Sequence, residues 1–173
     1  MTPARRATVS AGLLMFRRRN GAIELLLAHP GGPFWSHRDE GAWTIPKGVP
    51  AEGEELLDTA RREFVEETGS VPGGTFLPLG SIRQKAGKTV HAWAVEGDLD
   101  PSRVVSNTMS AEWPPRSGRR ITFPEVDRCE WFDPDTARRK LNPAQAELVE
   151  RLLDAVDDPD FDREAARHAD PTR

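Results

Sequence analysis

Tyrosine is absent from this 173-residue chain, and cysteine occurs only once, as Cys129. A lone cysteine excludes an internal disulfide and any zinc site built from several cysteines, and its expected place is a buried strand. Without tyrosine, tryptophan and phenylalanine must supply any large aromatic surface for a ligand. No apolar run is long enough to span a membrane. The formal charge of −4 argues against general nucleic-acid affinity, which needs a concentrated basic surface.

The length of the chain fits a single domain with short tails. We expect the domain to occupy residues 1–156 and a polar, mobile tail to occupy residues 157–173. Residues 1–16 start basic, but their apolar stretch is short and is followed by three arginines, unlike a cleaved signal peptide. Cytoplasmic location is therefore the expectation.

Strands and helices alternate along most of the chain. Strands are expected at 8–16, 23–28, 42–46, 77–84, 89–95 and 126–132, the first two joined by a hairpin turn at Asn20-Gly21. Helices are expected at 54–68, 134–140 and 143–156. Residues after Asp98, up to the strand at 126–132, read as a long irregular excursion. This pattern predicts an α/β fold with a mixed sheet.

The most informative segment is 48–70, GVPAEGEELLDTARREFVEETGS, which places clustered carboxylates on a short helix between two glycines. At about 100° per residue, one side of this helix is apolar, and it comprises Leu56, Leu57, Ala60 and Phe64. Glu63, Glu66 and Glu67 project to neighbouring positions, and Glu67 falls on the flank of the apolar stripe. A carboxylate there is costly unless a positive group meets it, which a divalent cation would do. The alternative is a solvated acidic face with ordinary ion pairs such as Arg62 with Glu66.

The spacing within this segment is specific. Gly48, Glu54, Arg62-Glu63-Phe64, Glu66-Glu67 and Gly69 resemble the Nudix box, which reads Gly, five residues, Glu, seven residues, Arg-Glu-apolar-any-Glu-Glu-any-Gly-apolar. Only the last position departs, because Ser70 stands where an apolar residue is usual. We expect Val71 to supply the packing contact that usually follows a glycine helix cap.

The resemblance implies an α/β/α sandwich with a mixed central sheet. It also implies a hydrolase that cleaves a pyrophosphate linkage in a nucleoside diphosphate joined to another group, with Mg²⁺ as cofactor and Mn²⁺ able to substitute. Mg²⁺ prefers oxygen ligands and keeps several waters, so a few carboxylates suffice. By position, Glu63 and Glu67 resemble the principal metal ligands. Glu66 resembles a further ligand or the base that orients the attacking water, although it could simply be the ion-pair partner of Arg62.

Other positions of the box resemble supporting residues of the catalytic site. Arg62, which we count among the catalytic residues, and Glu54 resemble the pair that fixes loop and helix, and Glu54 could join the metal shell through water. Gly48 is expected to free the backbone for a sharp turn. Nudix proteins commonly add a glutamate from outside the box. We favour Glu125 for that role over Glu130 and Glu112, although each could be a surface charge.

Residues before the box bear on the substrate. Many Nudix enzymes that act on ADP-ribose or nucleoside triphosphates have Pro-Gly-Gly where this chain has Pro46-Lys47-Gly48. A lysine there resembles enzymes of dinucleoside polyphosphates or diphosphoinositol polyphosphates, since added phosphates call for an added cation. The alternative is a solvated loop lysine. Arg83, Lys85 and Lys88 could extend the phosphate-binding surface.

A nucleobase needs a flat apolar surface. Trp35 and Trp113 are the candidates, because both lie in segments rich in glycine and proline, whereas Trp93 lies in a strand and is expected in the core. The segment 114–120, PPRSGRR, could be a lid that carries its arginines, Arg116, Arg119 and Arg120, toward phosphates, or a disordered basic loop.

The sequence thus predicts a Mg²⁺-dependent Nudix pyrophosphohydrolase whose favoured substrate is a dinucleoside polyphosphate. Alternatives are a nucleoside triphosphate pyrophosphatase and an ADP-ribose or nucleotide-sugar pyrophosphatase. A nucleotide-sensing module without catalysis is less favoured, because such modules usually lose box glutamates that this chain keeps. The expected partner is a nucleotide-like small molecule, and a homodimer is possible.

Overall fold

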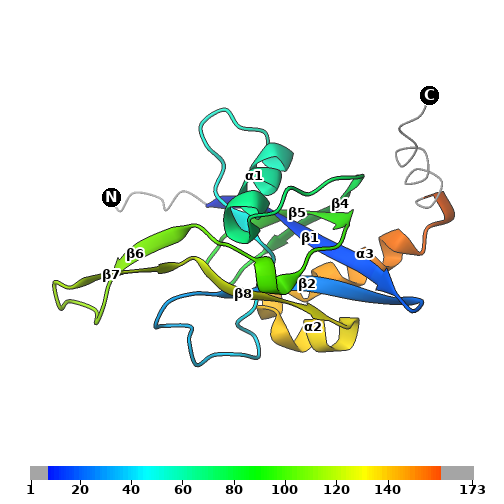
Figure 1. Cartoon of the computed structure of the whole chain (residues 1–173). Coiled ribbons are helices and arrows are strands. Elements are labelled where there is room, and N and C mark those ends of the chain that lie inside the picture. Colours follow the sequence, from blue (N-terminus) through cyan, green and yellow to red (C-terminus); the bar gives the residue numbers. More distant parts are fainter. Residues whose placement is uncertain (1–7, 161–173) are drawn as a thin grey trace.

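The computed structural model describes residues 8–160, which form a mixed six-stranded sheet with helices on both faces (Figure 1). The strand order is β4-β5-β1-β2-β8, and β3 pairs with β1 outside this path. The strands are β1 (Val9–Arg19), β2 (Ala22–Pro30), β3 (Lys47–Gly48), β4 (Phe76–Arg83), β5 (Thr89–Glu96) and β8 (Val126–Phe132). The helices are α1 (Leu56–Thr68), α2 (Pro134–Lys140) and α3 (Glu147–Val156), with 3₁₀ turns at Pro101–Arg103 and Pro143–Gln145.

The central strand β1 is parallel to β5 and antiparallel to β2 and β3. Its side chains alternate between the two faces of the sheet. Leu13 and Met15 join the core beneath α1, whereas Leu14 and Phe16 join the core beneath α2 and α3. Two separate cores therefore hold three layers together, as the expected α/β/α sandwich requires.

Helix α1 begins at Leu56 and ends where the sequence predicts, at a left-handed Gly69 with φ of 77°. The Gly69 N–H donates to Val65 O at 2.8 Å, which satisfies a terminal carbonyl of the helix. The expected packing by Val71 is wrong, because this side chain is 81% exposed. Val105 holds the helix end instead, by donating its N–H to Thr68 O at 3.0 Å.

Two strand predictions need correction. The segment 42–46 forms only isolated bridges, at Trp43 and Thr44, and regular pairing starts at β3, where Lys47 and Gly48 lie opposite Gly12 and Ala11. The expected irregular excursion contains a hairpin of β6 (Thr108–Glu112) and β7 (Arg120–Pro124), which forms a sheet of its own. It extends from the body of the domain (Figure 1).

Cys129 lies buried on β8 as expected, and burial raises the pKa of its thiol to about 12. Among residues 8–160, no helix combines the length and apolarity needed to cross a bilayer. Most of the predicted tail, residues 161–173, lies outside the described residues. The division of the chain at residue 156 and the homodimer therefore stay predictions.

Candidate active site

One cavity of about 410 Å³ lies between β3 and the loop that leads from it to α1, the side of α1 that carries the glutamates, and the base of the β6–β7 hairpin. Most of the predicted site residues meet there: Trp35, Lys47, Gly48, Glu63, Glu66, Glu67 and Glu125. Residues far apart in the sequence therefore converge on one site. Of the three candidates for the glutamate outside the box, only Glu125 lines this cavity.

Two carboxylates of α1 are buried at the cavity floor. Glu63 is 8% exposed and Glu67 is 5% exposed, which places Glu67 at the edge of the core as the helix periodicity predicts. Burial raises the pKa of Glu67 to about 8, although the charge of Lys47 opposes this shift. Burial likewise raises the pKa of Glu63, and the negative charge of Glu66 adds to it. Both carboxylates are thus held where a cation would relieve the cost of ionisation.

Gly48 is essential to this arrangement because of its lack of a side chain. A Cβ built on Gly48 would lie 2.1 Å from Glu63 Cδ, far closer than non-bonded carbons approach. Gly48 lies in β3, where it pairs with Ala11 of β1, so the expected place at a sharp turn is wrong. The residue instead allows the carboxylate of Glu63 to rest against the backbone of β3.

Arg62 lies behind the carboxylates and organises them. Its Nη1 donates to Glu63 Oε1 at 3.0 Å and to Glu66 Oε1 at 3.1 Å. Its Nε and Nη2 grip both oxygens of Glu54 at 2.9 Å, and Nη2 also donates to Val49 O at 3.2 Å. The guanidinium fork thus ties the helix to the preceding loop. Arg62 is outside the lining of the cavity, which makes it a positioning residue.

Glu54 completes this brace. Its carboxylate also accepts hydrogen bonds from Thr59 Oγ1 at 2.7 Å and from the Ala51 N–H at 3.1 Å. The hydrogen bonds from Arg62 first, and then those from Thr59 and Ala51, lower the pKa of Glu54 to about 2. Glu54 therefore stays ionised at neutral pH and keeps Arg62 in place.

Two lysines share the cavity with the carboxylates of α1. Lys47 and Lys88 both line it, and the Lys47 N–H donates to Glu67 Oε2 at 3.2 Å. Burial lowers the pKa of the Lys47 ammonium, and the nearby charge of Lys88 lowers it further. The two ammonium groups are close enough that each disfavours the charged form of the other. An anion with several charges would therefore be stabilised beside them.

The donor set fits a hard divalent cation. Within residues 8–160, no three carboxylate, imidazole or thiol side chains form a ready-made metal cage. Mg²⁺ does not need one, because it binds through one or two carboxylates together with waters and substrate phosphates. Glu63 and Glu67 supply buried oxygen ligands, and Glu66 supplies a further oxygen at the cavity wall.

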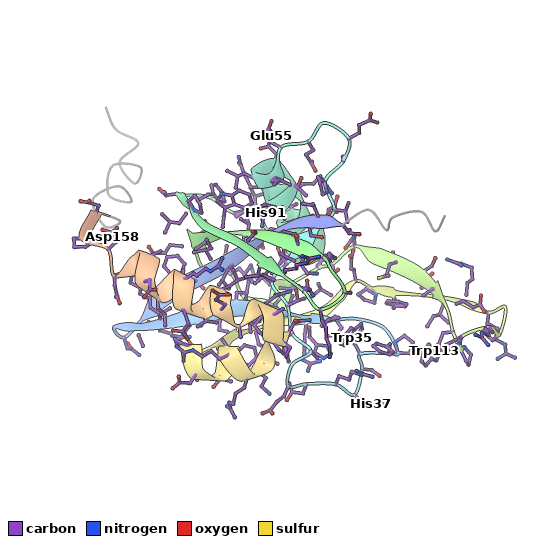
Figure 2. The ribbon with its side chains drawn as sticks, turned by 180° about the vertical axis from the view of Figure 1, so that it is seen from behind. Trp35, His37, Glu55, His91, Trp113 and Asp158 are labelled. Carbon is purple, nitrogen blue, oxygen red and sulfur yellow. The ribbon has the colours of Figure 1, made fainter. Side chains whose placement is uncertain are left out.

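Several predicted substrate residues lie elsewhere. Arg83 and Lys85 are exposed and outside the cavity lining. Trp113 is on the β6–β7 hairpin, also outside the cavity lining, whereas Trp35 lies at the body of the domain (Figure 2). Glu130 pairs with Arg128 at 3.6 Å. Glu112 accepts from the Gly118 N–H at 3.3 Å.

Sequence reasoning missed some walls of the cavity. Gln84, Met109 and Asn142 line it, each from a different segment. The fully buried Gln145 accepts a hydrogen bond from the Ile45 N–H at 3.0 Å, which fixes the segment that leads into β3. A polar residue within the apolar pattern of 143–156 was the available signal for Gln145.

Comparison with known proteins agrees with this geometry. A protein-family model, described as the NUDIX domain, matches residues 6–152 of this chain. The chain therefore belongs to the Nudix family, whose hydrolases cleave pyrophosphate bonds and generally use a divalent metal.

Solved structures confirm the fold. An Ap4A hydrolase of C. elegans in a binary complex is 21% identical, with a TM-score of 0.63 over 86% of this chain and 98% of that chain. The NUDIX domain of Shewanella oneidensis NrtR, complexed with ADP ribose, is 17% identical, with a TM-score of 0.62 over 88% of this chain and 90% of that chain. The Nudix hydrolase RenU of M. smegmatis is 21% identical, with a TM-score of 0.52 over 87% of this chain and 86% of that chain.

Proposed function

We propose that this protein is a Mg²⁺-dependent pyrophosphohydrolase that cleaves a phosphoanhydride bond in a nucleoside diphosphate-linked substrate. The favoured substrate is a dinucleoside polyphosphate. The observation that carries the proposal is that Lys47 and Lys88 line the same cavity as the carboxylates of Glu63, Glu67 and Glu125. Lysines are suited to phosphate oxygens. The buried carboxylates are suited to the metal that bridges such oxygens.

Each part of the cavity has a distinct task in this proposal. A divalent cation bound by Glu63 and Glu67 supplies charge neutralisation at the phosphates and a more acidic water. Glu66 and Glu125 are the carboxylates available to orient or deprotonate the attacking water. Trp35 offers an aromatic face for a nucleobase.

Lys47 favours a polyphosphate over a substrate with only two phosphates. Its ammonium and that of Lys88 supply two positive charges beyond the metal, and each added phosphate adds negative charge that they can offset. The similarity to an Ap4A hydrolase is in keeping with this preference. The similar NrtR domain binds ADP ribose, so ADP-ribose is the second candidate substrate.

A phosphate-release screen tests the proposal. The purified chain is incubated with diadenosine polyphosphates, ADP-ribose, nucleoside triphosphates, capped RNA and diphosphoinositol polyphosphates, with Mg²⁺, with Mn²⁺ and with a chelator. We expect metal-dependent turnover, fastest with a diadenosine polyphosphate. Metal binding without turnover of any of these compounds would refute the hydrolase and favour a nucleotide sensor.

A further inference from the structure

The β6–β7 arm, defined as residues 108–124, forms a sheet separate from the main sheet of the domain. Its two strands pair only with each other, from Thr108 opposite Pro124 to Glu112 opposite Arg120. An isolated two-stranded hairpin is marginally stable in water unless something covers one face. In Figure 1 the arm extends beyond the three-layer body.

The two faces of the arm differ in chemistry. Because side chains alternate along a strand, the register assigns Ser110, Glu112, Arg120 and Thr122 to one face. It assigns Met109, Ala111, Ile121 and Phe123 to the other. Pairing continues one step further, since the Trp113 N–H donates to Arg119 O at 2.8 Å. Trp113 and Arg119 therefore extend the apolar face toward the tip.

This apolar face is continuous with the active-site cavity. Met109 lines the cavity and is 44% exposed. The ring of Phe123 packs against Gly32, where a Cβ would come within 2.6 Å of it. Both contacts show that the apolar face is turned toward the cavity and the loop that carries Trp35. In Figure 2, Trp113 lies farther from the body of the domain than Trp35 does.

The outer part of the face carries an aromatic ring and a cation. Trp113 is 36% exposed, and none of the ion pairs among residues 8–160 uses Arg119 or Arg116. Trp113 lies four residue steps along the strand from Met109, which corresponds to roughly 13 Å of reach beyond the cavity. An exposed tryptophan beside a free guanidinium matches a nucleobase attached to phosphate.

We propose that the apolar face of the β6–β7 arm is a second nucleoside subsite, in which Trp113 stacks on the distal base of a dinucleoside polyphosphate and Arg119 contacts its phosphates. This inference rests on the proposed function and adds to it the place where the second nucleoside of the substrate binds. A cavity of about 410 Å³ is at the lower end of the volumes that hold one drug-sized ligand. The second nucleoside of such a substrate must therefore lie outside it, and the arm borders the cavity at Met109.

The test compares a substrate with two nucleosides and a substrate with one. Diadenosine tetraphosphate and adenosine tetraphosphate are each assayed with Mg²⁺ on the whole chain and on Trp113→Ala, Trp113→Phe and Arg119→Gln. Thr122→Ala, on the opposite face of the arm, is the matched control. Circular dichroism and thermal unfolding verify that each variant is folded.

Stacking on an aromatic ring contributes about 1–3 kcal/mol per base, so Trp113→Ala should raise the KM for diadenosine tetraphosphate about 5- to 150-fold. The KM for adenosine tetraphosphate should change less than about twofold, and Trp113→Phe should restore most of the loss. Arg119→Gln should act in the same direction, and Thr122→Ala should change neither KM.

Equal effects of Trp113→Ala on both substrates, or no effect on either, would overturn the second subsite while leaving the hydrolase intact. A wild-type chain that cleaves neither substrate with Mg²⁺ would overturn the proposed polyphosphate hydrolase, and the subsite with it.

Discussion

The carboxylate of Glu63 rests directly on the backbone of Gly48, so close that a single methyl group on Gly48 would lie 2.1 Å from Glu63 Cδ. Gly48 belongs to β3, and Glu63 to α1. The contact therefore connects β3, which carries Lys47, with α1, which carries the carboxylates. Arg62 Nη1 also donates to Glu63 Oε1 at 3.0 Å, so two contacts limit the freedom of this side chain.

Gly48→Ala should therefore displace Glu63 without unfolding the domain. A misplacement of about 1 Å can cost a catalytic site about 10²-fold, and we expect a fall in kcat of that order with Mg²⁺. Steady-state kinetics measure it. Gly73→Ala is the matched control, because a Cβ at Gly73 meets nothing within 4 Å. Activity of Gly48→Ala equal to that of the control would contradict the positioning of Glu63 by this contact.

Glu67→Gln removes a charge but almost no volume. Glu67 is buried at the core edge, and a neutral amide is no costlier there than a carboxylate whose pKa burial has raised to about 8. The variant should keep or increase its thermal stability. The loss of a metal ligand should cost several kcal/mol of transition-state stabilisation, at least about 10²-fold in kcat/KM. The exposed Glu52→Gln serves as control, and unchanged Mg²⁺-dependent turnover in Glu67→Gln would refute the assignment.

The brace between Glu54 and Arg62 predicts a pH dependence of stability. The pKa of Glu54 is about 2 in the folded protein and 4.5 without these contacts, so the folded state favours the ionised carboxylate. Its contribution is present above pH 4.5 and is lost as the pH falls toward 2. The wild type and Glu54→Gln should therefore differ more in their free energy of unfolding at pH 7 than at pH 3. Urea unfolding at both pH values measures this difference. A difference that is constant between these pH values would contradict the brace.

The acidic helix could be predicted in detail because helix periodicity is a local property. The flank position of Glu67 and the glycine end of α1 follow from residue spacing alone, and both are confirmed. The walls of the cavity could not be predicted in this way. Gln84, Met109 and Asn142 come from three segments, and tertiary packing decides which segments meet.

The β6–β7 arm was missed for a different reason. Its strands have five residues each, and the prolines and glycine between them are typical of an irregular loop. The signal was present as period-two alternation, with Met109, Ala111 and Trp113 in one run and Ile121 and Phe123 in the other. Long-range packing also places Lys88 in the cavity lining and leaves Arg83 and Lys85 outside it, a distinction that no local sequence pattern could indicate.

Lys47→Gln tests the phosphate-binding role that separates Lys47 from the other basic residues nearby. A hydrogen bond to a charged group contributes about 1.5–3 kcal/mol, so kcat/KM for diadenosine tetraphosphate should fall about 10- to 100-fold. Lys47→Arg should recover part of this loss, because it keeps the charge in a different geometry. Lys85→Gln is the matched control, since Lys85 is exposed and outside the cavity lining. Equal losses in Lys47→Gln and Lys85→Gln would mean that general surface charge attracts the substrate, and added salt would remove this contribution. A loss confined to Lys47→Gln that persists in high salt supports a direct contact inside the cavity.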